Sequence, residues 1–110
     1  MLIILKKQLK IYTAINGKQP FIEWLESLKD KTVRYRIKER LDRVALGNFG
    51  DHKFIDDGIY ELRLNFGSGY RIYYGNEKDT IILLLCGGDK SSQKKNIKQA
   101  IAYLKDYLSG

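Results

Sequence analysis

The feature that most constrains the fold is an alternation of apolar and polar side chains in two neighbouring segments, 60–66 and 70–74. The apolar positions are Leu62, Leu64, Phe66, Tyr70, Ile72 and Tyr74. Successive side chains of a strand point to opposite faces of a sheet, so this period of two predicts two strands with one buried face. The segment Gly67-Ser68-Gly69 between them is rich in turn residues and predicts a β-hairpin.

A three-residue loop at 67–69 is a common hairpin connection and fixes a register. The expected pairs are Phe66 with Tyr70, Asn65 with Arg71, Leu64 with Ile72, and Arg63 with Tyr73. In this register Arg63 and Arg71 are diagonal neighbours on the face opposite the apolar one. The two arginines are therefore close enough to act on one ligand.

The rest of the chain supplies three further strand patterns, two before the hairpin and one after it, and three helix patterns. The expected elements are a strand within 2–12, a helix from Pro20 through Leu28, a helix from an Asp30 cap to Gly47, a short edge strand within 48–58, a central buried strand at 81–85, and a last helix capped by Ser91 or Ser92. This order predicts an α+β fold, with an antiparallel meander sheet, an N-terminal helical hairpin and a C-terminal helix. We expect one domain over residues 1–110.

The charge balance favours a polyanionic partner. Twenty Lys and Arg residues face thirteen Asp and Glu residues, which gives a net charge of +7 and an isoelectric point near 9.5. Neutralising phosphates releases counterions, so a domain this basic is typical of proteins that bind nucleic acid. The alternative is that the positive charge serves only solubility.

Two other features bear on the compartment. Cys86 is the single cysteine and follows an apolar run, so we expect a buried thiol and no internal disulfide. The apolar stretch before Lys6 is too short for a signal peptide or a membrane span. We therefore expect a cytoplasmic protein without a membrane partner.

The hairpin arginines suggest a phosphate clamp. Arg63 and Arg71 repel each other unless an anion lies between them, and guanidinium groups bind phosphate oxygens in pairs. Tyr73 and Asn65 on the same face would add a stacking surface and hydrogen bonds for an unpaired base. The alternative is a surface ladder of charges without a task, in which Glu61 compensates the arginines.

The segment GGDKSSQKKN, residues 87–96, places basic and hydroxyl side chains at a strand-to-helix junction. Backbone amides at a helix N-terminus attract anions, so Lys90, Gln93 and Lys94 are candidate RNA contacts. The spacing is not that of a Walker loop, and the lysines could equally be solvated residues at the start of a helix. If strand 81–85 lies beside the hairpin, its end brings Lys90 to the arginine face.

The segments GIYELRLNFGSGYRIYY and ILLLCGGDKSSQKKNIKQA, with FIEWLESLKDKTVRYRIKERLDRVALGNFGDHK upstream, resemble the RelE/ParE superfamily of type II toxin–antitoxin toxins. The resemblance is to the HigB-like branch, also called addiction-module killer proteins or phage Gp49-like proteins. It implies a toxin neutralised by an antitoxin, such as a small helix-turn-helix protein. It also implies ribosome-dependent cleavage of messenger RNA by the RNA's own 2′-hydroxyl, which leaves a 2′,3′-cyclic phosphate. No metal and no cofactor is implied.

The resemblance also implies roles for particular residues. Arg63 matches the arginine that binds the transition-state phosphate, and Arg71 matches an arginine that braces that site. Lys90 and Lys53 stand where the family places basic residues and are the candidates for the general base. His52 is a less favoured candidate, and Ile97 occupies the place of a tyrosine found in RelE-type toxins. The identity of the base is left open.

Two other functions remain open from the sequence. ParE-like relatives share the fold and inhibit DNA gyrase by binding it, without enzymatic activity. A nucleic-acid-binding module without toxicity would bind RNA with a steep salt dependence and cut nothing. The cluster of Arg63, Arg71, Lys90 and Lys53 favours RNA cleavage over both.

Overall fold

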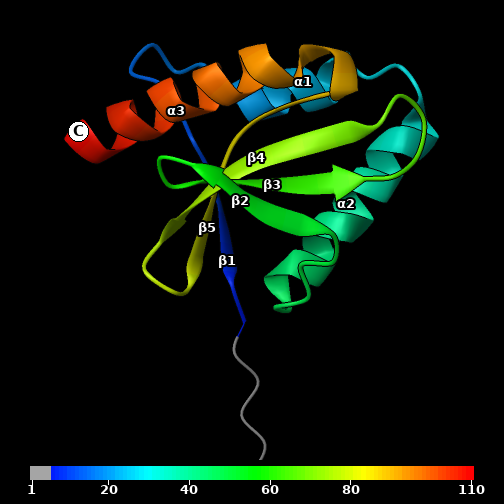
Figure 1. Cartoon of the computed structure of the whole chain (residues 1–110), viewed down its shortest axis with the longest axis horizontal. Helices are drawn as coiled ribbons and strands as arrows, with labels where there is room; N and C mark the ends of the chain where they lie inside the picture. The colour runs from blue at the N-terminus through cyan, green and yellow to red at the C-terminus, as the bar shows by residue number, and fades with distance from the viewer. Residues whose placement is uncertain (1–5) are drawn as a thin grey trace, which may run out of the picture.

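The structure is a computed structural model that describes residues 6–110, and it places helices on both faces of one five-stranded sheet (Figure 1). The strands are β1 (Gln8–Ile11), β2 (His52–Asp56), β3 (Ile59–Leu64), β4 (Tyr70–Glu77) and β5 (Ile81–Gly88). The helices are α1 (Pro20–Ser27), α2 (Lys31–Ala45) and α3 (Gln93–Ser109), with a short 3₁₀ turn, η1 (Lys90–Ser92), before α3. The α+β class is confirmed.

The sheet is mixed, and this corrects the expectation of a wholly antiparallel sheet. Strands β2 to β5 form the expected antiparallel meander, but the order β1-β5-β4-β3-β2 pairs β1 with β5 in parallel, starting at Gln8 opposite Ile81. A parallel pair needs a long connection, and here both N-terminal helices and three strands separate the two partners. The strand expected within 2–12 is shorter than that range, and its first positions, 2–5, lie outside the described residues.

The N-terminal helices begin as expected. Pro20 is the first residue of α1, and the Asp30 carboxylate caps α2 by accepting a hydrogen bond from the Thr32 amide at 2.8 Å. The expected helical hairpin is matched only in part, because α1 makes its main contacts with β5. Each helix directs its apolar stripe to the sheet. No helix within residues 6–110 is long and apolar enough to cross a membrane.

Two core clusters lie on opposite faces of the sheet. Helices α1 and α2 bury the face that carries Leu62, and α3 packs on the face that carries Ile59 and Tyr73. In Figure 1, α2 lies behind the strands and α3 runs along the upper border of the sheet. Cys86 belongs to the α3 cluster and is buried as expected, and burial raises the pKa of its thiol to about 12.

Gly87 and Gly88 are the last residues of β5, which extends beyond the strand expected at 81–85. A Cβ on Gly87 would lie 2.3 Å from Trp24 of α1, and a Cβ on Gly88 would lie 1.9 Å from the Asn96 side chain of α3. The two glycines therefore let both helices press against the end of β5 from opposite faces. This close packing fixes where α3 begins.

The register of the hairpin differs from the expected one by two residues. Leu64, rather than Phe66, pairs with Tyr70, and a five-residue turn at 65–69 connects the strands. Gly67 and Gly69 both adopt positive φ angles, 58° and 77°, which a longer turn accommodates. A shift of two leaves the side chains that remain in β3 and β4 on their expected faces, because the side-chain period of a strand is also two.

Candidate anion-binding site

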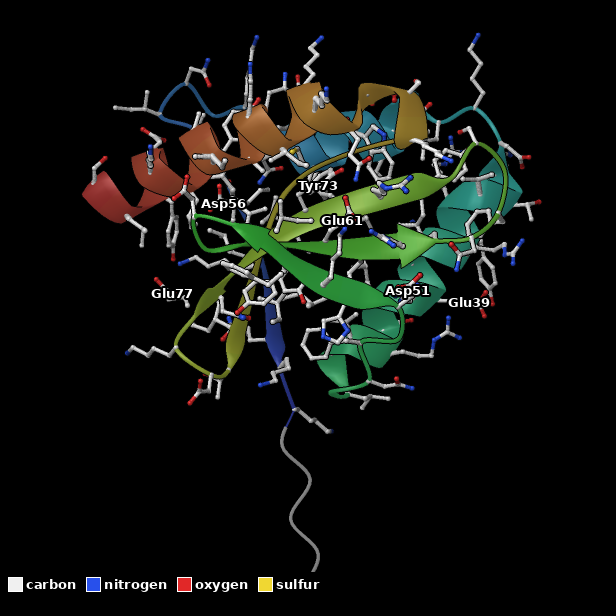
Figure 2. The ribbon with its side chains drawn as sticks, in the orientation of Figure 1. Glu39, Asp51, Asp56, Glu61, Tyr73 and Glu77 are labelled. Atoms are coloured by element: carbon white, nitrogen blue, oxygen red, sulfur yellow. The ribbon has the colours of Figure 1, made fainter. Side chains whose placement is uncertain are left out.

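A buried carboxylate, Glu61, lies at the centre of a polar cluster on the α3 face of the sheet (Figure 2). Its Oε1 accepts a hydrogen bond from Arg63 Nε at 2.9 Å. Its Oε2 accepts hydrogen bonds from the Tyr73 hydroxyl at 3.0 Å and from Gln93 Nε2 at 2.9 Å. Arg71 Nε lies 3.6 Å from the same Oε2. Side chains from β3, β4 and the start of α3 thus all contact the carboxylate of Glu61.

The pKa values in this cluster follow from burial and hydrogen bonding. Burial alone would raise the pKa of Glu61, but hydrogen bonds from Arg63, Gln93 and Tyr73 together hold it below the ordinary value. Burial and the neighbouring carboxylate raise the pKa of Tyr73. At neutral pH the cluster therefore contains an ionised carboxylate and a neutral phenol that donates to it.

Arg63 and Arg71 are direct cross-strand partners rather than the expected diagonal neighbours. Their side chains are 32% and 13% exposed. Arg71 Nη1 donates to the Gly69 carbonyl at 2.8 Å, and its buried Nε has no hydrogen-bond partner in the described part of the chain. Among residues 6–110, the only ion pairs within 4 Å are those of these two arginines with Glu61.

Lys90 adjoins the arginines, as the sequence predicted. Its backbone amide lies 3.5 Å from the Ser68 carbonyl of the hairpin turn. A Cβ on Gly69 would lie 3.3 Å from Arg71 Nη1 and 3.5 Å from Lys90 Cβ. The position between these two residues is therefore narrow, and a glycine adds no side-chain atom to it. The end of β5 and the hairpin turn thus bring a third cation to the cluster.

The start of α3 forms a shallow hollow of about 510 Å³ beside the cluster, lined by Lys90, Ser91, Ser92, Gln93, Lys94 and Lys95. Lys94 is exposed there, whereas Gln93 turns inward to Glu61. Ser92 stands at the N-cap position of α3, as expected, but its side chain makes no capping hydrogen bond there; Asp89 caps η1, and its carboxylate accepts from the Ser91 amide at 2.9 Å. An aspartate is as good a capping residue as serine and lies one turn earlier.

The neighbours Lys53 and His52 on β2 point to opposite faces of the sheet. Lys53 pairs with Glu61 and so lies on the α3 face, exposed, next to the cluster. His52 pairs with Leu62 on the other face, where its ring lies 5.2 Å from that of Phe49. The structure therefore brings Lys53 to the candidate site and keeps His52 away from it.

One expected RNA contact, Tyr73, is wrong in its assigned role, and a second, Asn65, lies elsewhere than expected. Tyr73 has no exposed ring to stack on a base, because α3 covers it and its hydroxyl is bound to Glu61. Asn65 lies in the hairpin turn rather than on the arginine face, and its amide donates to the Asp51 carboxylate at 3.3 Å. Asn65 instead lines a separate hollow of about 340 Å³ beside α2, together with Arg36 and Phe66.

The structure confirms one part of the alternative in which Glu61 compensates the arginines, namely its ion pairs with Arg63 and Arg71. It leaves an excess of positive charge, because Arg63, Arg71 and Lys90 stand against one carboxylate. Sequence reasoning missed that Glu61 is the centre of the cluster. The available signal was its spacing of two from Arg63, which places both side chains on the same face.

The arrangement is chemically suited to an oxyanion such as phosphate. The guanidinium groups of Arg63 and Arg71 lie on adjacent strands, and the backbone and Cβ of Lys90 lie next to the hairpin turn. Guanidinium forks match the geometry of phosphate oxygens. Within residues 6–110 no group of three or more His, Cys, Asp and Glu side chains is arranged to hold a metal ion.

Comparison with known proteins identifies the family. Residues 23–105 match the family described as phage derived protein Gp49-like (DUF891). An uncharacterized protein of Haemophilus influenzae is 50% identical over 80 residues, which cover 73% of this chain and 81% of that protein. The family match runs from within α1 through α2 and β2 to β5 to most of α3, so it includes every residue of the cluster. The chain therefore belongs to the phage-derived Gp49-like proteins, a toxin-like family.

Proposed function

We propose that this protein is the toxin of a type II toxin–antitoxin system, in the HigB-like branch of the RelE/ParE superfamily, and that it cuts messenger RNA on the ribosome. The observation that carries the proposal is the convergence of Arg63, Arg71 and Lys90 beside the turn at 65–69. The excess of positive charge across the chain supports an RNA substrate. Membership of a toxin-like family supports the toxic role.

The proposed reaction is an internal transfer of phosphate within the RNA. The 2′-oxygen attacks the adjacent phosphorus, the bond from phosphorus to the 5′-oxygen breaks, and a 2′,3′-cyclic phosphate and a free 5′-hydroxyl form. A base accepts the 2′-proton, and an acid protonates the leaving 5′-oxygen. No water, metal or redox partner enters this balance.

Arg63 and Arg71 would stabilise the charge that develops on the phosphorane. Preorganised donors of this kind typically contribute about 3–4 kcal/mol each to the transition state. Lys90 and Lys53 are the candidates for the base, because both lie beside the cluster, one at each border. Gln93 and Lys94, at the start of α3, would orient the RNA that flanks the cut.

The proposed partners and compartment follow from this reaction. The ribosome would supply much of the alignment between the 2′-hydroxyl and the phosphate, which suits so small a domain. The toxin would act in the cytoplasm and would be neutralised by a cognate antitoxin, such as a small helix-turn-helix protein. No cofactor is required.

Controlled expression in cells tests this function against the other candidates. Rapid loss of full-length messages, with an arrest of translation, is the expected result. Induction of the DNA-damage response with messages intact would instead indicate a gyrase inhibitor. RNA binding with a steep salt dependence, and neither effect in cells, would indicate a non-toxic binding module.

A further inference from the structure

An ionised carboxylate is costly at the position of Glu61, because its side chain has no exposure to solvent. Replacing a buried ion pair by apolar residues of similar volume is often neutral or stabilising, so packing alone gives no reason for a charge here. The residues that pair with this charge are the same arginines that a phosphate site needs. The carboxylate and the arginines therefore form one unit.

We infer that Glu61 is a positioning residue, which holds Arg63 by a hydrogen bond to its Nε and Arg71 by an ion pair, so that the outer nitrogens of both guanidinium groups face one phosphate. This inference rests on the proposed function. It assigns to Glu61 a role that acts through the arginines, because a side chain without exposure does not itself contact RNA.

The two carboxylate oxygens face different arginines. Oε1 holds Arg63 Nε at 2.9 Å, and Oε2 lies 3.6 Å from Arg71 Nε. A guanidinium group bound through Nε keeps its Nη donors for another ligand. Arg71 Nη1 binds the Gly69 carbonyl, which turns this guanidinium toward the turn beside Lys90. Within the described residues, Arg63 thus keeps both Nη groups and Arg71 keeps Nη2 for another ligand.

Two further residues hold the carboxylate in place. Tyr73 donates from β4 and Gln93 donates from the start of α3, both to Oε2. The orientation of Glu61 is therefore fixed from two elements besides its own strand. A carboxylate that only offset charge would need proximity to the arginines but not this set of directed bonds.

Two substitutions separate charge from geometry. Glu61→Gln keeps the shape and removes the charge, whereas Glu61→Asp keeps the charge and withdraws it by one methylene. The matched control is Glu77→Gln at the other end of β4, where Glu77 Oε2 accepts a hydrogen bond from the Tyr107 hydroxyl at 2.7 Å. Figure 2 shows Glu77 well apart from Glu61 and Tyr73.

Cleavage and binding are measured separately. Cleavage is followed as the single-turnover rate on ribosome-bound message. Binding is measured with a short RNA that carries a 2′-deoxy substitution at the cut and so stays whole. We expect both Glu61 variants to lose about 100-fold in rate, the usual cost of a displacement near 1 Å. The Kd of Glu61→Gln should be unchanged or tighter, because the variant is more positive. Glu77→Gln should match the wild type in both.

Three results would overturn the inference. The first is a Glu61→Gln variant that cuts at the wild-type rate. The second is a Glu61→Asp variant that keeps the wild-type rate and Kd, which would leave charge offset as the only role. The third is a parallel loss of rate, binding and thermal stability, which would indicate a structural role alone.

A measurement independent of cleavage separates this inference from the proposed function. In the wild type, the side-chain Nε–Hε groups of Arg63 and Arg71 should show high NMR order parameters, and those of exposed Arg43 should show low ones. Glu61→Asp should lower the order of the first two only. Equal mobility of all three in the wild type would overturn the inference whether or not the protein cuts RNA. Ordered arginines in a protein that cuts nothing would overturn the proposed function alone.

Discussion

Arg63 and Arg71 stand opposite one another on β3 and β4, and each directs its Nε at a different oxygen of the same buried carboxylate. Like charges at directly opposed positions of a sheet destabilise it. Glu61 offsets that repulsion only in part, since one negative charge faces two positive ones. An added phosphate would complete the compensation.

Replacing Arg63 by alanine should reduce cleavage about 100- to 1,000-fold, the usual cost of removing one preorganised donor. The fold should persist, because Arg71, Tyr73 and Gln93 still pair with Glu61. Toxicity in cells, circular dichroism and antitoxin binding check the three parts. Arg43→Ala on α2 is the matched control and should stay toxic. A fully toxic Arg63→Ala variant would show that the clamp is misassigned.

The neighbours His52 and Lys53 should respond differently to alanine substitution. Lys53 lies beside Glu61 on the α3 face, so Lys53→Ala should slow cleavage. His52 lies on the other face against Phe49, so His52→Ala should leave the rate unchanged. Rates measured on the same ribosome-bound message compare the two. If His52→Ala slowed cleavage more than Lys53→Ala, the reacting phosphate would bind on the face that carries His52 and not on the α3 face.

Substituting Tyr73 by phenylalanine should lower stability without weakening RNA binding. The change removes one hydrogen bond to a charged group, which is typically worth about 1.5–3 kcal/mol, and keeps the buried ring. Urea unfolding measures the loss, and binding of the uncut RNA measures affinity. Tyr60→Phe, on the opposite face, is the control for both. A marked loss of affinity in Tyr73→Phe alone would mean that this ring does contact RNA.

Acid should reduce the stability that the Glu61 charge supplies. The folded state holds the pKa of Glu61 below the ordinary value of 4.5, so the unfolded chain binds more protons as the pH falls through this range. The contribution is thus complete above pH 4.5 and is lost as the pH falls toward the folded-state pKa. As the pH falls through this interval, the unfolding free energy of the wild type should decrease relative to that of Glu61→Gln. A difference that stays constant with pH would contradict the ionised assignment.

Much of the fold was accessible from local patterns, and the limits have identifiable physical causes. The period of two placed Arg63, Arg71 and Tyr73 on one face because that pattern depends only on neighbours in the chain. The register was not accessible, since it depends on the positive φ angles of Gly67 and Gly69. The parallel pairing of β1 with β5 joins segments far apart in sequence, and no local pattern reports it.

The candidate site shows the same division. Lys90 was placed correctly because a strand-to-helix junction beside the hairpin has few positions available. Tyr73 was misread as exposed because its strand pattern cannot show that α3 crosses above it. Asn65 was misplaced because the turn is longer than expected. The sequence thus mispredicts the position of a side chain where an element distant in sequence covers it, or where the length of a turn decides at which residue a strand ends.

The most direct test of the central claim maps the ends of messages cut in a reconstituted translation reaction. The account predicts 3′ ends that carry a 2′,3′-cyclic phosphate and 5′ ends with a free hydroxyl in the presence of the wild type. It predicts intact messages with Arg63→Ala. Uncut messages with the wild type, or equal cutting by the Arg63→Ala variant, would contradict it.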